Sequence, residues 1–217
     1  MLFSRHKITL PTREESLPGR DEAWFPLSER HRVLDAPLVT DASNIPEGYQ
    51  VALFGLGCFW GAEEIFWRLP GVWSTSVGYA GGTTPHPSYE QVCSGRTGHT
   101  EAVRVVFDPT KVTYAALVRA FYEFHDPTQG TPPGNDVGTQ YRSAIYTNSL
   151  EQEETARKLT AAYEPVLQRA GYGAITTEIK PAPVYYYAED YHQQYLAIHV
   201  DGYRCHSATD VPFPPGV

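Results

Sequence analysis

The chain of 217 residues lacks two features that would assign it to large functional classes. It has no run of Lys or Arg, and its formal net charge is −8. We therefore expect neither nucleic acid nor an anionic membrane as a partner. It also has no long apolar stretch near its start, because residues 1–8 carry some positive charge but are followed by Pro11 and charged residues. This pattern predicts neither a secretory signal nor a membrane span.

Cysteine is scarce, and its spacing suggests no pairing. The three cysteines are Cys58, Cys93 and Cys205, an odd number without a C-x-x-C pair. This usage fits a reducing compartment better than a disulfide scaffold, so we expect a cytoplasmic protein. The cysteines also lack the spacing of zinc ligands, and no metal site is predicted.

The composition indicates one globular domain with appendages, since 41% hydrophobic residues can bury a full core. Residues 1–48 are polar and dotted with proline, which predicts an extension that lies along the domain or stays partly loose. The catalytic domain is predicted at residues 49–200. Residues 201–217 are predicted to form a flexible tail.

Hydrophobic periodicity and turn residues predict the order of the elements. The expected strands are 51–56, 72–79, 99–107, 142–147 and 175–179, and the expected helices are 58–69, 114–125, 149–165 and 189–199. The first six elements run strand, helix, strand, strand, helix, strand, which is the split β-α-β order of the ferredoxin-like motif. We predict an α+β fold with an antiparallel-rich mixed sheet and helices packed on it. The Pro- and Gly-rich stretch 126–140 is expected to be a functional loop.

The pentapeptide Gly57-Cys58-Phe59-Trp60-Gly61 carries the first chemical signal. It places a thiol between a buried strand and the first turn of a helix, where the positive end of the helix favours the thiolate. The flanking glycines leave the sulfur uncrowded. Two interpretations fit these residues: a reactive cysteine beside a small apolar pocket, or a buried structural cysteine.

The second signal is a carboxyl on a strand. Alternation in residues 101–107 puts Glu101 on the same face as Val103 and Val105. A buried carboxyl without a cation keeps its proton to higher pH and can donate it. The alternative is an edge carboxylate that pairs with Arg104 or meets water.

Several segments, taken together, resemble the class A peptide methionine sulfoxide reductases. They are Gly57-Cys58-Phe59-Trp60-Gly61, Val77-Gly78-Tyr79-Ala80-Gly81-Gly82, Gly98-His99-Thr100-Glu101, His125-Asp126-Pro127, Gly134-Asn135-Asp136-Val137-Gly138-Thr139-Gln140-Tyr141-Arg142-Ser143, and Tyr187-Ala188-Glu189-Asp190-Tyr191-His192-Gln193-Gln194-Tyr195. The resemblance covers about residues 50–203. Because the motifs follow the family's order, together they are far more specific than the pentapeptide alone.

The resemblance implies a reaction and its two main residues. The reaction is the reduction of the S epimer of methionine sulfoxide, free or in proteins, by a thiol, which repairs oxidised proteins. Cys58 matches the nucleophile and Glu101 matches the proton donor. Both are needed, because the sulfoxide sulfur is electrophilic only if its oxygen is being protonated.

The resemblance also implies a substrate site. Tyr89 and Tyr141 match two phenols that hydrogen-bond the sulfoxide oxygen, and Asp136 matches an acidic residue of the site. Phe59 and Trp60 match an aromatic wall around the sulfur's methyl group, which gains about 1 kcal/mol when buried. Simpler structural roles are the alternatives: the aromatics as core residues and Asp136 as a turn former.

Attack on the sulfoxide leaves Cys58 as a sulfenic acid, which a second thiol can convert to a disulfide. Cys93 resembles a bystander in the family, whereas Cys205 lies in a tail that could reach Cys58. We expect a Cys58–Cys205 disulfide that thioredoxin, or another dithiol, reduces. The tail departs from the family pattern, because Arg204 separates Tyr203 from the cysteine and the usual glycines are missing.

Two rival functions remain at this point. One is a cysteine hydrolase in which His99 or His125 acts as the base for Cys58. The other is a metal-binding or interaction module built on Cys and His. For the reductase we expect a monomer with no bound cofactor.

Overall fold

The computed structural model describes residues 9–130, 138–204 and 208–216. Its strands form one six-stranded sheet in the order β5-β4-β1-β3-β2-β6. They are β1 (Gln50–Gly55), β2 (Val72–Ala80), β3 (Thr100–Phe107), β4 (Ala144–Thr147), β5 (Glu178–Pro181) and β6 (Tyr185–Tyr187). The α-helices are α1 (Phe59–Trp67), α2 (Tyr89–Cys93), α3 (Tyr114–Glu123), α4 (Leu150–Arg169) and α5 (Tyr195–Ile198), with 3₁₀ turns η3 (Thr139–Tyr141) and η4 (Asp190–His192).

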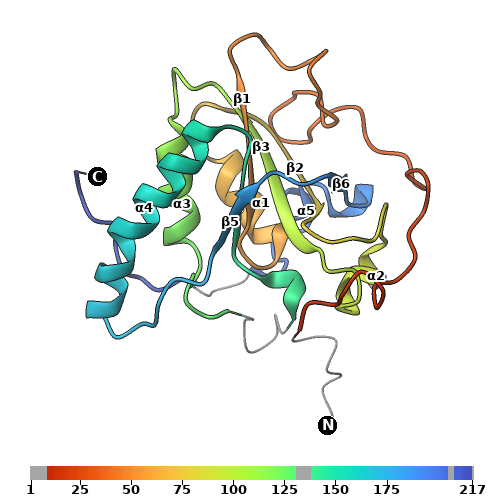
Figure 1. Ribbon diagram of the computed structural model, residues 1–217. Coiled ribbons are helices and arrows are strands. Elements are labelled where there is room, and N and C mark those ends of the chain that lie inside the picture. The colour runs from red at the N-terminus through yellow and green to blue at the C-terminus, as the bar shows by residue number, and fades with distance from the viewer. Residues whose placement is uncertain (1–8, 131–137, 205–207, 217) are drawn as a thin grey trace.

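The centre of the sheet confirms the predicted α+β fold. The neighbours β4, β1, β3 and β2 are antiparallel, which is the sheet of the split β-α-β motif with α1 and α3 as its helices. At one edge β5 is added parallel to β4, and at the other β6 is added antiparallel to β2. Figure 1 shows α3 and α4 side by side at one end of the sheet and α1 behind its centre.

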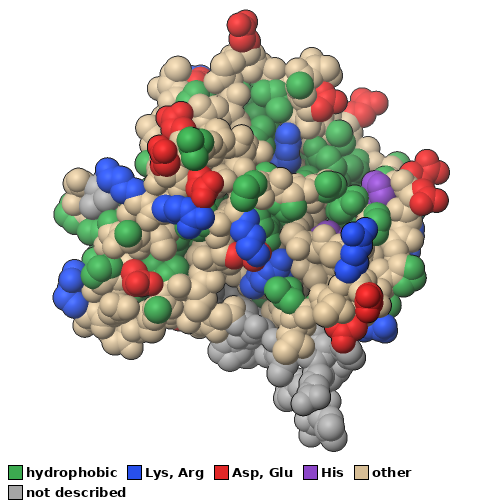
Figure 2. Space-filling model, viewed as in Figure 1, with side chains coloured by type: hydrophobic (Ala, Val, Ile, Leu, Met, Phe, Trp, Pro, Cys, Tyr) green, Lys and Arg blue, Asp and Glu red, His purple; other side chains and the backbone are tan. Residues whose placement is uncertain are grey.

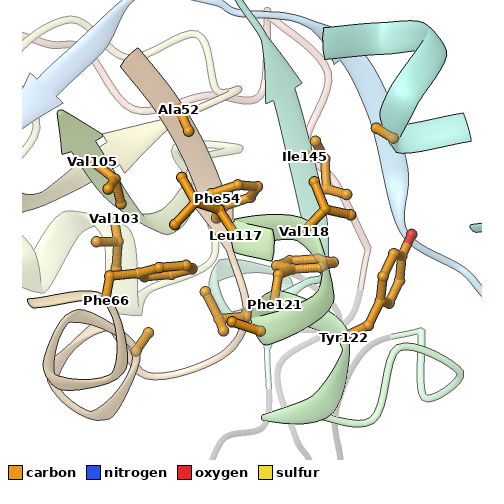
Figure 3. Packing of buried hydrophobic residues seen from close by; sticks show 14 of the residues in the cluster. Ala52, Phe54, Phe66, Val103, Val105, Leu117, Val118, Phe121, Tyr122 and Ile145 are labelled. Carbon is orange, nitrogen blue, oxygen red and sulfur yellow. The ribbon is translucent and has the colours of Figure 1, made fainter. Parts of the chain in front are cut away.

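Alternation along the strands sends one set of side chains to the helices. Phe54 of β1 and Val103 of β3 belong to the main core with residues of α1, α3 and α4, whereas Leu53 and Ala102 belong to a smaller cluster on the other side of the sheet. Figure 3 shows the aromatic centre of this core. There the ring of Phe54 lies 5.1 Å from that of Phe66 and 5.5 Å from that of Phe121, measured between centroids.

The N-terminal segment 9–48 runs along the domain and crosses the sheet at the edge of β2. His31 bonds Thr75 on the helix side, with 2.7 Å between His31 Nε2 and Thr75 Oγ1, and Pro37 accepts a bond from Ser74 on the other side. Figure 1 shows this segment, in red and orange, on the side of the molecule that carries β6. The domain boundary near residue 48 stays a prediction.

Two predicted elements differ from those observed in type or position. The helix expected at 189–199 is wrong: the chain forms the turn η4, reverses at Gln194 with a φ of +50°, and makes only the short α5. The strand expected at 175–179 lies later, as β5, and β6 has no counterpart among the expected strands. Both strands lie at the edges of the sheet. Their position is set by backbone pairing with β4 or β2, not by a run of apolar residues in the sequence.

The helix expected to run from 149 to 165 is longer. Ser149 caps it by accepting a hydrogen bond from the Gln152 amide, but α4 continues through Pro165 to Arg169. Its buried residues Leu159, Tyr163 and Leu167 recur every four positions. Burying this stripe offsets the backbone hydrogen bond that Pro165 cannot donate.

The described part of the C-terminal tail packs on α3 and α4. Phe213 is 9% exposed and its ring stacks on Tyr163 at 4.8 Å, while its amide donates to Glu123. Tyr163 also donates its hydroxyl proton to the carbonyl of Val211 at 2.6 Å. Residues 201–217 are predicted to form a flexible tail, and the described residues 208–216 dock on the helices chiefly through the ring of Phe213.

Phe54 is the side chain on which we test the core. It is completely buried, so Phe54→Ala leaves a cavity between β1, α1 and α3 and should lower the free energy of unfolding by about 3–5 kcal/mol. Val184→Ala is the control, because Val184 is 65% exposed and its loss should change stability by less than about 0.5 kcal/mol. Urea unfolding measures both, and equal effects would contradict this account of the core.

Candidate functional site

Cys58 lies where β1 gives way to α1. Gly57, with a φ of +90°, turns the chain sharply, and Cys58 occupies the N-cap position of α1. Glycine suits this turn because a left-handed φ is strained for residues with a side chain. The thiol is therefore held beside the backbone amides that open α1, and the residue is 8% exposed.

Glu101 comes from β3 and meets the same helix start. Its Oε2 accepts a hydrogen bond from the backbone N–H of Phe59 at 2.9 Å, and the residue is 1% exposed. Arg104 lies on the other face of the sheet, where its guanidinium donates to Thr40. The Glu101 carboxyl thus faces the helix side and bonds the amide of the residue that follows Cys58, whereas Arg104 lies on the opposite face of the sheet.

Two phenols share this neighbourhood. Tyr89 is the first residue of α2, which Ser88 caps, and Tyr141 is the last residue of η3. Burial raises the pKa of Tyr141 well above its usual value, with further contributions from the charges of Glu101 and Cys58. Burial likewise raises the pKa of Tyr89, followed by the influence of Cys93 and then of Glu101. Both phenols therefore keep their protons near neutral pH and can act as hydrogen-bond donors.

The aromatics after Cys58 differ in burial. Phe59 is 1% exposed and packs in the main core, with its ring 5.9 Å from that of Tyr79. Trp60 is partly exposed and stacks on Tyr195, with 3.9 Å between ring centroids and an interplanar angle of 11°. Of the two, Trp60 has the surface that a ligand can contact.

Glu189 and His192 hold the site together, and the sequence analysis gave neither a role. Glu189 Oε1 accepts the backbone N–H of Tyr89, and its Oε2 accepts the hydroxyl of Tyr79, both at 2.9 Å. His192 Nδ1 accepts the indole N–H of Trp60 at 3.0 Å. The signal was present, since both residues lie in the last of the family-like motifs, but the helix predicted there concealed which side chains point inward.

A groove of about 600 Å³ opens beside Cys58. Leu56 and Ile65 form part of its apolar lining, and Arg204 and Ala208 also line it. Arg204 is fixed there by Glu64 of α1, with 2.7 Å between Arg204 Nε and Glu64 Oε2. Both residues that flank the segment 205–207 thus line the groove that contains Cys58.

The remaining candidate residues divide into two groups. Asp136 and Cys205 lie outside the described residues. His99 and His125, the bases of the hydrolase alternative, are buried with both ring nitrogens engaged: His99 contacts the Gly82 amide and the Thr84 carbonyl, and His125 contacts the carbonyl of Phe121 and the hydroxyl of Ser143. Neither imidazole has a nitrogen available to take a proton from a thiol.

Residues 9–130, 138–204 and 208–216 carry neither a metal-binding cluster nor a membrane-spanning helix. No group of three or more His, Cys, Asp or Glu side chains there is placed to hold a metal ion. None of the helices in this part of the chain is long and apolar enough to cross a membrane. On the face seen in Figure 2, basic and acidic side chains are interspersed.

Comparison with known proteins gives a consistent result. The family model described as peptide methionine sulfoxide reductase matches residues 50–211. The peptide methionine sulfoxide reductase MsrA of Salinispora arenicola is 58% identical over all of this chain and 98% of its own length. MsrA 1 of Synechocystis is 54% identical over 99% of this chain and 95% of its own.

Solved structures agree with the sequence comparisons. Methionine sulfoxide reductase A of Corynebacterium diphtheriae has a TM-score of 0.83 and 46% identity, covering 94% of this chain and 99% of its own. Mxr1 from Saccharomyces cerevisiae in reduced form has a TM-score of 0.69 and 30% identity, over 83% of this chain and 98% of its own. Mxr1 has also been crystallised in complex with Trx2.

His192 provides a pH test of the site. Burial lowers its pKa from 6.5 to about 3, so the folded state stays neutral at this residue while the unfolded state takes up a proton below pH 6.5. The free energy of unfolding should therefore fall on acidification, by about 2 kcal/mol from this residue between about pH 8 and pH 5. Denaturant unfolding across this range, compared with His192→Asn, measures the contribution. An imidazole NMR signal of His192 that titrates near pH 6.5 would contradict it.

Proposed function

The chain belongs to the peptide methionine sulfoxide reductase family, and from this premise we propose that it reduces the S epimer of methionine sulfoxide with Cys58 as nucleophile. The single observation that carries the proposal is the hydrogen bond from the Phe59 amide to Glu101. It sets a carboxyl beside the residue that follows the thiol, so that a nucleophile and an acid meet at one point. Sulfoxide reduction needs this pair, whereas acyl transfer needs a base on the thiol.

In the proposed reaction, the Cys58 thiolate attacks the sulfoxide sulfur while Glu101 delivers a proton to the oxygen. The bond formed between the two sulfurs and the sulfur–oxygen bond of the substrate then break as the protonated oxygen passes to the Cys58 sulfur. Methionine leaves with its sulfur reduced, and Cys58 becomes a sulfenic acid. The amino end of α1 favours the negative charge of the attacking sulfur. Burial of both groups strengthens their interaction with the polar S–O bond.

The two phenols are assigned to the sulfoxide oxygen. The ordinary phenol pKa near 10 already keeps Tyr89 and Tyr141 protonated at neutral pH, and burial raises the pKa of each further, so both can donate hydrogen bonds as the oxygen gains charge. Trp60, with Phe59 beneath it in the core, is assigned to the methyl group of the substrate. Asp136 is assigned to the substrate site by its match to the family motif alone.

For recycling, we assign Cys205 as the thiol that condenses with the sulfenic acid, releasing water and forming a Cys58–Cys205 disulfide. The groove beside Cys58 supports this step, because its lining includes Arg204 and Ala208, the residues on either side of 205–207. A thioredoxin, or another dithiol, then reduces the disulfide, as the complex of Mxr1 with Trx2 suggests by analogy. We place the enzyme in the cytoplasm as a monomer that repairs oxidised proteins and needs no bound cofactor.

The thiol assignments are tested by mass spectrometry on a peptide that contains methionine sulfoxide. The parent should lower the peptide mass by one oxygen and form the Cys58–Cys205 disulfide. Cys58→Ser should abolish both, whereas Cys205→Ser should still reduce about one equivalent of peptide but not turn over with thioredoxin. Cys93→Ser is the matched control and should turn over normally. Unchanged turnover in Cys58→Ser would contradict the assignment of Cys58 as the nucleophile.

The acid is tested by Glu101→Gln, which keeps the acceptor for the Phe59 amide but cannot supply a proton. The single-turnover rate of sulfoxide reduction at neutral pH should fall by about 10²-fold, while binding of the peptide persists. Glu90→Gln is the control, because Glu90 is exposed on α2 next to Tyr89. A Glu101→Gln variant as fast as the parent would remove Glu101 from the acid role.

A further inference from the structure

We infer that Arg32, in the N-terminal segment and outside the residues that the family model matches, is a positioning residue for the aromatic wall of the substrate pocket. It acts through the segment 189–195, which carries His192 and Tyr195 against Trp60. The inference rests on the proposed function for its kinetic consequence. The geometry itself does not depend on that function.

Arg32 bonds residues at both ends of the turn η4. Its Nη2 lies 2.6 Å from Asp190 Oδ2, and its Nη1 donates to the carbonyl of Gln193 at 2.7 Å. The backbone amide of Arg32 donates to Gln194 Oε1 at 3.2 Å. The Ser28 amide adds a bond to Asp190 Oδ1 at 2.7 Å. One arginine thus holds the residues immediately before and after the stretch that contains His192.

The segment 189–195 needs such support because it has little regular structure. Gln194 has a φ of +50°, an unfavourable conformation for a residue with a side chain. Its amide and side chain bond the buried Glu63 of α1, at 2.8 Å to Oε2 and 2.7 Å to Oε1. Glu63 in turn accepts a bond from Thr75, which contacts His31, the neighbour of Arg32. The N-terminal segment is therefore linked to 189–195 in two ways. One is the buried chain of hydrogen bonds through Thr75 and Glu63, and the other is the direct contacts of Arg32.

The segment 189–195 packs against the aromatic residues of the proposed substrate pocket. The ring of His192 lies 4.5 Å from that of Tyr89 and 5.0 Å from that of Phe59, measured between centroids, and it accepts the indole proton of Trp60. Tyr195 stacks on the face of Trp60. If η4 shifts, the tilt of the Trp60 indole shifts with it. Arg32 touches none of the reacting groups, so its effect is on substrate binding rather than on the chemical step.

The test is Arg32→Ala, with Arg30→Ala as the matched control. Arg30 belongs to the same segment but pairs with the exposed Asp35. We expect Arg32→Ala to raise KM for a methionine sulfoxide peptide about 10-fold with the single-turnover rate at saturation almost unchanged. Arg32→Lys, which can still reach Asp190, should recover part of the loss. Arg30→Ala should leave both parameters as in the parent.

A second readout is independent of catalysis. The indole N–H resonance of Trp60, assigned with Trp60→Phe, should shift in Arg32→Ala and keep its place in Arg30→Ala. Asp190→Asn serves if Arg32→Ala does not fold, because it removes the ion pair and keeps an acceptor for Ser28. If the parent reduces no sulfoxide, the proposed function fails while the resonance still tests the positioning role.

The contrary result is equally clear. A folded Arg32→Ala or Asp190→Asn with lower stability but unchanged KM and unchanged Trp60 resonance would show that Arg32 only fastens the N-terminal segment. That outcome would overturn the inference and leave the reductase assignment intact.

Discussion

The site depends on the antiparallel pairing of β1 with β3. This register sets Phe54 opposite Val103. Continued two residues forward from Phe54 and two residues back from Val103, the same register brings Leu56 level with Glu101, and the chain after Leu56 turns through Gly57 into Cys58 and α1. Because the pairing fixes both backbones, the Glu101 carboxyl meets the first amide of α1 without any long side chain having to reach. A slip of the register by one residue would send Glu101 to the other face, away from the thiol.

The sequence predicted this centre because its signals are local. Gly57 and the alternation in 101–107 identify the turn and the inward-facing carboxyl from neighbouring residues alone, and the core helices follow from apolar spacing. It failed at 189–199, where the polar side chains of Glu189 and Gln194 point inward and bond partners more than a hundred residues away. Hydrophobic periodicity cannot reveal hydrogen bonds between buried polar groups that lie far apart in the sequence. The motif match placed these residues near the site but could not say what they hold.

Burial sets the chemical character of the site as much as the residue types do. The phenols of Tyr89 and Tyr141 remain donors, and His192 remains neutral, because each is removed from water. The polar groups behind them are satisfied in pairs, as when Glu189 accepts both the Tyr89 amide and the Tyr79 hydroxyl. A site built this way keeps its donors aimed in advance, so little reorganisation is needed when charge develops on a bound oxygen.

The docking of the C-terminal chain has a consequence for the rate of recycling. Arg204 is anchored by Glu64, and the hydroxyl of Tyr172 holds the carbonyl of Thr209 at 3.1 Å. The chain is therefore anchored on both sides of residues 205–207, and the covalent span from residue 204 to residue 209 cannot exceed about 17 Å. For Cys205 as the proposed resolving thiol, anchors this close in the chain correspond to an effective concentration in the millimolar range. Disulfide closure would then be a first-order event, independent of enzyme concentration and faster than capture of the sulfenic acid by dilute external thiols.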